Sequence, residues 1–162
     1  MAGSEEVKRG IDVAVGFIAY RMRSEFEVRR RLVRARLGDE EIVAVIERIR
    51  EMRLIDDRAF AIAYTRDQII GSKRGPIRVR SGLTSLGVSE EISAMAIEEV
   101  FAEHDTLAMA TALGEKRWAK LSRTRDQTFR KKRVYEYLVR RGYSFADARH
   151  VVDDLERTSG QS

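Results

Sequence analysis

Hydrophobic residues recur every three or four positions along most of this chain, a spacing that places them on one face of an α-helix. In residues 39–53, for example, Ile42, Val45, Ile46 and Ile49 share one face. Short polar turns interrupt the pattern, which predicts nine helices, at residues 11–20, 24–36, 39–53, 58–70, 76–86, 89–103, 106–121, 126–141 (or 128–141) and 144–157. We therefore expect an all-α protein.

A short frame with Val and Leu four residues apart, one turn of helix, occurs three times. The pairs are Val28 and Leu32, Val79 and Leu83, and Val134 and Leu138, and each is followed within six residues by a glycine, namely Gly38, Gly87 and Gly142. A period near 50 residues is typical of stacked helical units. We predict three tandem three-helix repeats, at residues 11–53, 54–104 and 105–157, in an elongated, curved array with flexible ends at 1–10 and 158–162.

Polar residues that can cap a helix precede several of the predicted helices. Asp39, Ser89 and Ser144 follow the three glycines and are expected to start the third helix of each repeat. Asp56 and Asp57 are adjacent carboxylates, a pairing that can carry acid–base or metal chemistry. Because they lie between an apolar pair and a helical segment, we interpret Asp56 as an N-cap and Asp57 as a residue favoured by the helix dipole.

Charge is distributed unevenly among the predicted helices. The 162 residues carry 31 Lys and Arg against 26 Asp and Glu, a net charge of +5. The middle-helix segments 21–36, 73–86 and 130–141 have net charges of +5, +4 and +5, whereas the third-helix segments 39–52, 88–105 and 144–157 have −3, −6 and −2. A basic protein of this kind favours an anionic partner, and nucleic acid is the commonest one.

The basic residues of the middle helices are the candidate contact residues. If Val28 and Leu32 mark the buried stripe, an advance of about 100° per residue places Arg30 and Arg34 on the opposite face. Such faces, stacked in one direction, would form a basic ridge for a polyanion or an acidic protein groove. The candidates are Arg23, Arg29, Arg30, Arg34, Lys73, Arg74, Arg78, Arg80, Lys132, Arg133, Arg140 and Arg141. Alternatively, Arg29, Arg30 and Arg31 pair with the acidic third helices and hold the repeats together.

The residues that usually carry enzyme chemistry are missing or isolated. The chain has no cysteine, and His104 and His150 have no second ligand at metal-binding spacing. Neither a P-loop nor a dinucleotide-binding glycine motif is present. We expect no catalytic residue, no metal and no cofactor. Since no apolar run reaches about 18 residues and the N-terminus lacks signal-peptide features, we expect a cytoplasmic protein without a membrane role.

The motifs together resemble those of the RecX family, bacterial regulators of the RecA recombinase. The resemblance extends from about residue 15 to residue 156. It rests on Arg23-Ser24-Glu25, Leu54-Ile55-Asp56-Asp57 with Phe60-Ala61, Arg74-Gly75-Pro76 with Arg78-Val79-Arg80, and Arg140-Arg141-Gly142-Tyr143-Ser144. Two positions depart from the family pattern: Arg53 stands where a glycine is usual, and Gly82 where an acidic residue is usual. Gly82 lowers helix propensity, so we expect a weaker middle helix in the second repeat.

The resemblance implies a monomeric, non-enzymatic inhibitor of RecA in DNA repair, recombination and the SOS response. Its partners would be the RecA filament and single-stranded DNA, with double-stranded DNA as a further candidate, and it would limit filament growth, ATP hydrolysis, strand exchange and co-protease activity. A second hypothesis is a sequence-specific helix-turn-helix DNA-binding regulator, although acidic third helices are poorly suited to enter a DNA groove. A third is a protein-interaction array without a nucleic-acid role.

Overall fold

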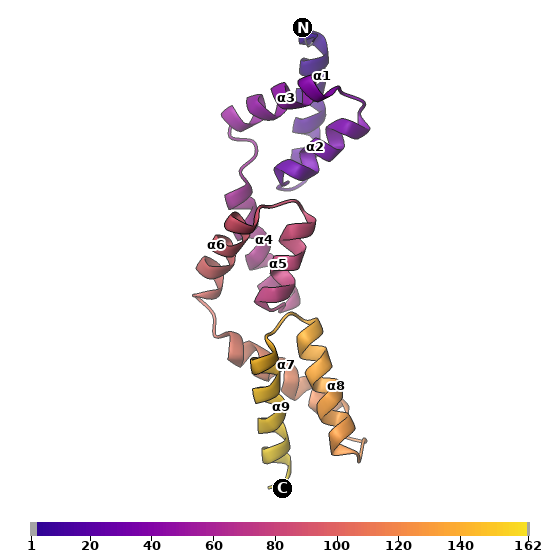
Figure 1. Ribbon diagram of the computed structural model, residues 1–162, viewed down its shortest axis with the longest axis vertical. Coiled ribbons are helices and arrows are strands. Elements are labelled where there is room, and N and C mark those ends of the chain that lie inside the picture. Colours follow the sequence, from indigo (N-terminus) through magenta and orange to yellow (C-terminus); the bar gives the residue numbers. More distant parts are fainter. Residues whose placement is uncertain (1–2, 162) are drawn as a thin grey trace. The chain divides into compact units, whose positions relative to one another are not determined.

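The computed structural model of this protein describes residues 3–161. Within that range the chain forms nine α-helices and no β-strand (Figure 1), which confirms the predicted all-α fold. The helices are α1 (Ser4–Ile18), α2 (Glu25–Arg34), α3 (Asp39–Glu51), α4 (Asp57–Ser72), α5 (Pro76–Ser85), α6 (Glu90–Phe101), α7 (Thr106–Lys120), α8 (Gln127–Arg140) and α9 (Phe145–Ser159). Every boundary except the start of α1 lies within two residues of its predicted place.

Helix α1 begins at Ser4, seven residues before its predicted start. Glu5 and Glu6 lie in its first turn, where the helix dipole favours negative charge. Gly10 packs so closely on Leu37 and Val45 that an added Cβ would overlap both side chains. Packing and charge together explain why residues 4–10, expected in a flexible end, are helical, as are Thr158 and Ser159 at the other end. Residues 1, 2 and 162 of the predicted ends lie outside the described residues.

Side-chain caps start most helices, largely as predicted. Asp56 Oδ1 accepts a hydrogen bond from Ala59 N at 3.0 Å, and Ser89 and Ser144 cap α6 and α9 in the same way. The prediction for Asp39 was wrong. Gly38 is the N-cap of α3, without a side-chain hydrogen bond, and Asp39 is the first residue of the helix. A carboxylate there still interacts favourably with the N-terminal end of the helix dipole.

The turns that follow the three middle helices share one left-handed position. It lies eight residues after the frame valine and has positive φ: 63° at Arg36, 73° at Gly87 and 98° at Gly142. Gly38, which the sequence pattern grouped with the other glycines, instead has a φ of −74°. The first repeat therefore places an arginine where glycine is favoured, because only glycine adopts this conformation without a Cβ penalty.

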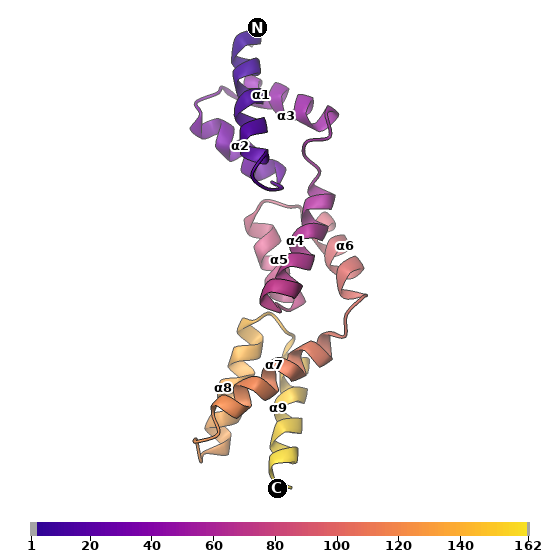
Figure 2. The ribbon, with the colours of Figure 1, turned by 180° about the vertical axis from the view of Figure 1, so that it is seen from behind.

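The chain divides into two compact units, Met1–Tyr64 with Gly82–Ala96, and Thr65–Ser81 with Ile97–Ser162. In the first unit α1, α2 and α3 enclose a core that includes Val28, Leu32 and Ile46. In the second, α7, α8 and α9 enclose a core with Val134 and Leu138. Figure 1 shows α8 and α9 in front of α7, and the reverse view of Figure 2 shows α7 in front, so α7 crosses this pair.

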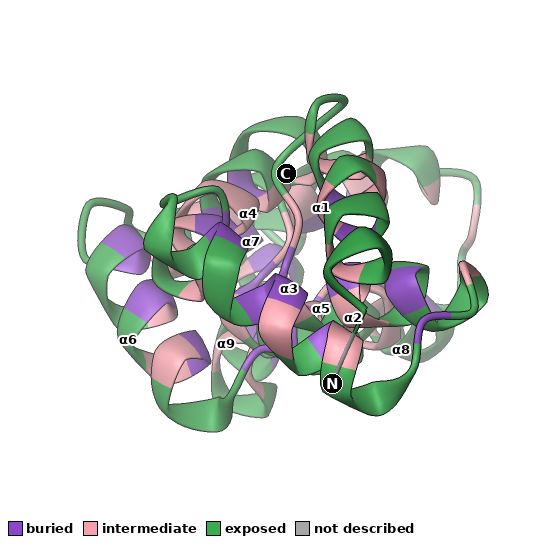
Figure 3. Ribbon diagram, turned by 90° about the horizontal axis from the view of Figure 1, so that it is seen from above, coloured by how far each residue is buried: buried purple, intermediate pink, exposed green. Residues whose placement is uncertain are grey.

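The Val and Leu of all three frames have no exposed surface, which confirms that they mark the buried stripes. Figure 3 shows the consequence for single helices: buried residues lie on one side of α6 and exposed residues on the other. Gly82 is helical and packs against Tyr64, where a Cβ would overlap the phenol ring. This contact explains why the second middle helix carries a glycine at some cost in helix propensity.

Within residues 3–161 no helix is long and apolar enough to span a bilayer. The same residues contain no group of three or more His, Cys, Asp or Glu side chains that could hold a metal ion.

Candidate anion-binding site

The N-terminus of α2 meets the C-terminal turn of α5 in the first unit. Ser24 Oγ donates a hydrogen bond of 2.6 Å to the carbonyl oxygen of Leu86. Ser24 also forms a complete capping box with Glu27. Phe26 covers Gly87 so closely that a Cβ on this glycine would overlap the Phe26 side chain. We call this contact the first junction.

The second unit contains an equivalent contact, in which the N-terminus of α5 meets the C-terminal turn of α8. Gly75 N donates to the Arg141 carbonyl oxygen at 2.8 Å, and Ile77 N donates to the Gly142 carbonyl oxygen at 3.0 Å. A Cβ on Gly142 would overlap the backbone nitrogen and Cβ of Arg78. We call this contact the second junction. Ser24 and Gly75 occupy one frame position, as do Gly87 and Gly142, so the same joint is built twice.

In the first junction an acidic residue pairs with the nearby arginines. The Glu27 carboxylate accepts from Arg21 at 2.5 Å and lies 3.8 Å from Arg23. The Arg23 guanidinium lies 3.9 Å from the centre of the Phe17 ring, and only 15% of the side chain is exposed. Arg23, a predicted contact residue, is therefore a packed and paired side chain with little surface to offer a partner.

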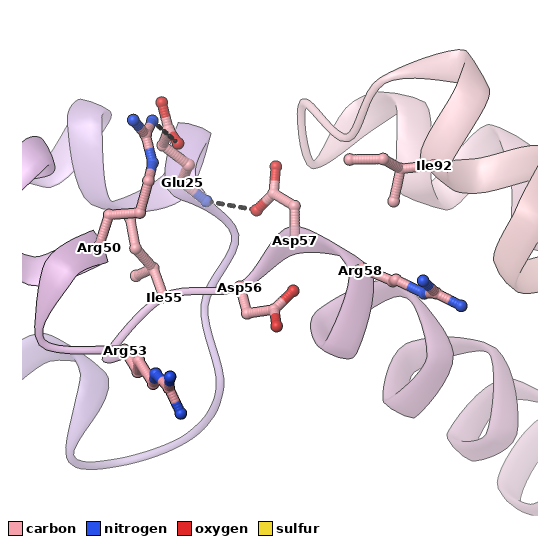
Figure 4. A pocket seen from close by; sticks show the side chains of 8 residues that line it. All are labelled: Glu25, Arg50, Arg53, Ile55, Asp56, Asp57, Arg58 and Ile92. Atoms are coloured by element: carbon pink, nitrogen blue, oxygen red, sulfur yellow. Dashed lines mark hydrogen bonds and ion pairs between the residues drawn. The ribbon is translucent and has the colours of Figure 1, made fainter.

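The pair Asp56-Asp57 lies beside this junction, in the pocket of about 610 Å³ drawn in Figure 4. Asp56 caps α4 as predicted. Asp57 has a further role, because its Oδ1 accepts from Glu25 N at 2.8 Å and so caps α2 as well. Three carboxylates and three arginines line the pocket: Glu25, Asp56, Asp57, Arg50, Arg53 and Arg58. Their charges balance, which fits a structural contact between the start of α4 and the start of α2.

The local environment shifts the pKa of two of these carboxyl groups in opposite directions. Burial raises the pKa of the Asp57 carboxyl. Burial also acts to raise the pKa of Glu25, but hydrogen bonds from Arg50 at 2.6 Å and Arg29 at 3.0 Å outweigh it, so the net pKa is lowered. Glu25 therefore stays ionised as the shared partner of two arginines. Arg29, another predicted contact residue, is engaged in this pair.

A pocket of about 760 Å³ lies at the second junction, and its charge is not balanced. Five of its described lining residues are arginines and none is acidic: Arg74, Arg78, Arg117, Arg140 and Arg141. We call this surface the arginine pocket. It gathers four of the twelve predicted contact residues from α5, α8 and the turns beside them. Arg117, from α7, was not among the predicted residues, because only the middle helices were expected to carry contact residues.

The donors in the arginine pocket have few acceptors among the described residues. Arg74 Nη1 donates to Gln68 Oε1 at 2.5 Å, and the Arg117 guanidinium lies 5.3 Å from the centre of the Tyr137 ring. The Nε atoms of Arg117 and Arg141 are buried and have no hydrogen-bond partner within residues 3–161. Arginine forks match the oxygens of phosphate and carboxylate, so this arrangement suits an oxyanion.

The remaining predicted contact residues do not gather at the arginine pocket. Lys132 pairs with Glu136 of its own helix at 3.9 Å. Arg30 and Arg133 lie 5.6 and 5.0 Å from the rings of Phe26 and Phe129, on their own helices. Arg34, Lys73 and Arg80 are exposed, and Arg80 has an interaction within the protein.

The structure does not show the alternative role, in which Arg29, Arg30 and Arg31 pair with the acidic third helices and hold the repeats together. Arg29 pairs with Glu25 of its own helix, four residues away. Neither Arg30 nor Arg31 forms an ion pair with a third helix within residues 3–161. The third helix α3 instead supplies a cation, Arg50, to the carboxylate of Glu25 in α2.

The fold and this site define an all-α protein of tandem three-helix units with an arginine-lined pocket at one of its joints. Family models match three successive three-helix segments: the first three-helix domain of RecX matches residues 11–48, the second 56–97 and the third 103–152. The chain belongs to the RecX family, which confirms the resemblance found in its motifs.

Relatives with the name regulatory protein RecX align over most of the chain. The protein of Geobacillus kaustophilus is 39% identical over 145 residues, which are 86% of this chain and 51% of that one. The present chain thus spans about half the length of that relative. The protein of Prosthecochloris aestuarii is 29% identical over 150 residues, covering 93% of this chain and 95% of its own length.

Solved structures of two RecX proteins share the fold. The crystal structure of RecX from Lactobacillus salivarius superposes with a TM-score of 0.81 at 19% identity, over 94% of this chain and 98% of the other. A second regulatory protein RecX gives a TM-score of 0.78 at 21% identity, over 91% and 72%. At these identities the similarity extends to the fold alone.

Proposed function

We propose that this protein is a non-enzymatic regulator of the RecA recombinase that binds the RecA–DNA filament. In this proposal it limits filament growth, ATP hydrolysis and strand exchange during DNA repair and recombination. Membership of the RecX family supports the regulatory role. The observation that carries the contact with DNA is the arginine pocket, where five arginines face one concave surface without an acidic neighbour among the described lining residues.

Electrostatics explain why such a surface favours the phosphate backbone. Each phosphate contact by Lys or Arg releases condensed counterions, so affinity rises with the number of contacts and falls with salt. Backbone contacts do not read the base sequence. They therefore suit a regulator that must act on filaments formed on any DNA. The exposed residues Arg30 and Arg34 would add further contacts beyond the pocket.

The test uses RecA-coated single-stranded DNA with and without the protein, read out by ATP hydrolysis and filament length. We expect the wild-type protein to lower both. The double variant Arg78→Ala with Arg140→Ala removes two exposed pocket arginines without an ion-pair partner in residues 3–161, so the fold should survive. Its binding to single-stranded DNA should weaken, and the salt slope should fall by roughly 0.7 for each phosphate that is no longer neutralised.

A matched control is Lys8→Ala with Arg48→Ala, which removes the same charge from exposed pairs outside the pocket. Inhibition should be retained in the control and reduced in the pocket variant. Full inhibition by the pocket variant, with circular dichroism unchanged in both, would contradict the proposed contact. A large preference for one duplex sequence over random duplexes would instead favour the sequence-specific regulator.

A further inference from the structure

The two junctions occupy the same frame positions but differ in charge. At the position of Glu27, which pairs with Arg21 and Arg23 in the first junction, the second junction has Arg78. At the positions of Ser85 and Leu86 it has Arg140 and Arg141. A joint of this shape can therefore be built without these arginines. Their charge is a property added to the second junction and not required to form it.

The added charge is unfavourable for the protein alone. Like charges around one pocket repel one another, and physiological salt, with a Debye length of roughly 8 Å, screens such neighbours only in part. The buried Nε donors of Arg117 and Arg141 without acceptors add a further cost. A ligand that brings negative charge and acceptor oxygens would offset both terms.

The number of arginines indicates the class of ligand. A single phosphate has few oxygens, and two or three bidentate arginine forks saturate them. Five arginines around about 760 Å³ provide donors for two or more adjacent phosphate groups. A DNA strand and a free nucleoside triphosphate both carry such groups.

A ligand in the pocket would also connect the two sides of the joint. Arg74 and Arg78 belong to α5 and the turn before it, whereas Arg140 and Arg141 lie at the end of α8. Between them run the backbone hydrogen bonds from Gly75 N and Ile77 N to the carbonyl oxygens of Arg141 and Gly142. Phosphate oxygens shared by arginines from both sides would hold these bonds closed.

We propose that the arginine pocket binds adjacent phosphate groups and that its occupancy locks the second junction. This proposal rests on the proposed function where DNA is the source of the phosphates. The lock itself needs only the phosphate chemistry. A free polyphosphate should therefore produce it without RecA or DNA.

The test measures backbone hydrogen exchange and thermal unfolding of the full chain with inorganic tripolyphosphate, against sodium chloride at equal ionic strength. Exchange of the Gly75 and Ile77 amides should slow, by about a hundredfold at roughly one hundred times Kd if they exchange only from the unbound joint. The unfolding midpoint should rise. Amides at the first junction serve as the internal reference and should change less.

The decisive variant is Arg78→Glu, which gives the second junction the residue of the first. It should abolish the tripolyphosphate effect at Gly75 and Ile77. The control is Arg133→Glu, with the same charge change at the third frame position, where the side chain is exposed and does not line the pocket. That variant should keep the effect. If Arg78→Glu does not fold, Arg140→Gln provides the same comparison with a smaller change.

Equal slowing in the Arg78→Glu and Arg133→Glu variants, or equal slowing by sodium chloride, would overturn the lock. Parallel arms with ATP and with oligothymidylate identify the source of the phosphates. Slowing by tripolyphosphate without DNA binding would leave the lock intact and defeat the proposed function. DNA binding and RecA inhibition that depend on the pocket, without any slowing at Gly75, would defeat the lock and leave the proposed function intact.

Discussion

The two junctions share one backbone arrangement but differ in the charge of the side chains around it. Both place the N-terminus of a middle helix against a left-handed glycine, Gly87 in one and Gly142 in the other. The first is closed by a side-chain hydrogen bond from Ser24 to the Leu86 carbonyl oxygen and has an ion pair between Arg21 and Glu27 beside it. The second is closed by backbone hydrogen bonds and carries five arginines without an acidic neighbour among the described lining residues. The shared part is geometric, whereas the part that differs is chemical and holds the candidate site.

The largest difference in stability between the junctions is expected at their glycines. An alanine at Gly142 combines a φ of 98° with overlap against the Arg78 backbone, which cannot rotate away. We expect Gly142→Ala to lower the free energy of unfolding by roughly 3 kcal/mol, from overpacking and left-handed strain together. Gly87→Ala should cost less, because the three atoms nearest to the added Cβ all belong to the Phe26 side chain.

Urea denaturation of both glycine variants measures this difference. The control is Gly16→Ala in α1, where an added Cβ has no neighbour within 4 Å. That variant should be neutral or stabilised by up to about 1 kcal/mol, because alanine favours the helix. Equal destabilisation by Gly142→Ala and Gly16→Ala would show that the second junction does not need its glycine.

An intermediate effect is expected at Tyr143, whose frame equivalent in the first junction is Val88. The Tyr143 hydroxyl donates a 2.6 Å hydrogen bond to the Lys73 carbonyl oxygen. Tyr143→Phe should therefore cost about 1 kcal/mol in unfolding free energy and leave an acceptor without its partner. Thermal unfolding at neutral pH measures the loss.

The same tyrosine predicts a dependence on pH. Burial raises the pKa of Tyr143 from 10.0 to about 12. Since the unfolded chain loses this proton first, its contribution to stability is complete below about pH 10 and is lost as the pH rises toward 12. Tyr143→Phe should flatten this part of the stability curve. A curve unchanged in the variant between pH 9 and 11.5 would rule out the buried hydroxyl as its source.

The smallest effect is expected in the first repeat, at the position equivalent to the two junction glycines. Arg36 occupies this left-handed position with a φ of 63°. Arg36→Gly should stabilise the protein by roughly 0.5 to 1 kcal/mol, because glycine relieves the Cβ penalty. Arg31→Gly, inside the preceding helix α2, is the matched control and should destabilise by a similar amount. Chemical denaturation of the pair tests the sign of both changes.

The helices could be predicted from the sequence because their signals are local. Apolar spacing, a capping side chain and a proline in the first turn of α5 each act within a few residues, so all boundaries but one were close. The grouping of Gly38 with Gly87 and Gly142 was wrong, because the residue with positive φ at the equivalent position is Arg36. The sequence pattern also missed the start of α1, which depends on Gly10 packing against a residue of α3.

Only part of the candidate site could be predicted from the sequence, because the pairing of its charges depends on the tertiary structure. Arg23 and Arg78 lie in similar basic segments, yet one is paired with Glu27 and the other lines the pocket. Arg117 had no signal in its own segment that could distinguish it from neighbouring basic residues. Whether a charge is neutralised depends on which side chains the fold brings beside it, and sequence spacing does not report that.

The amphipathic helices within residues 3–161, the threefold frame and the family to which the chain belongs could all be read from the order of its amino acids. Those features follow from hydrogen bonds and apolar contacts between residues three or four apart, which periodicity records directly. Which arginines meet became visible only in the folded chain. The fold brings residues 74 and 78 beside residues 117, 140 and 141, which forms the arginine pocket of the second junction. In the first junction it instead places the acidic Glu27 beside Arg21. Electrostatic neighbours this far apart in the sequence are set by packing, and the candidate site depends on that packing.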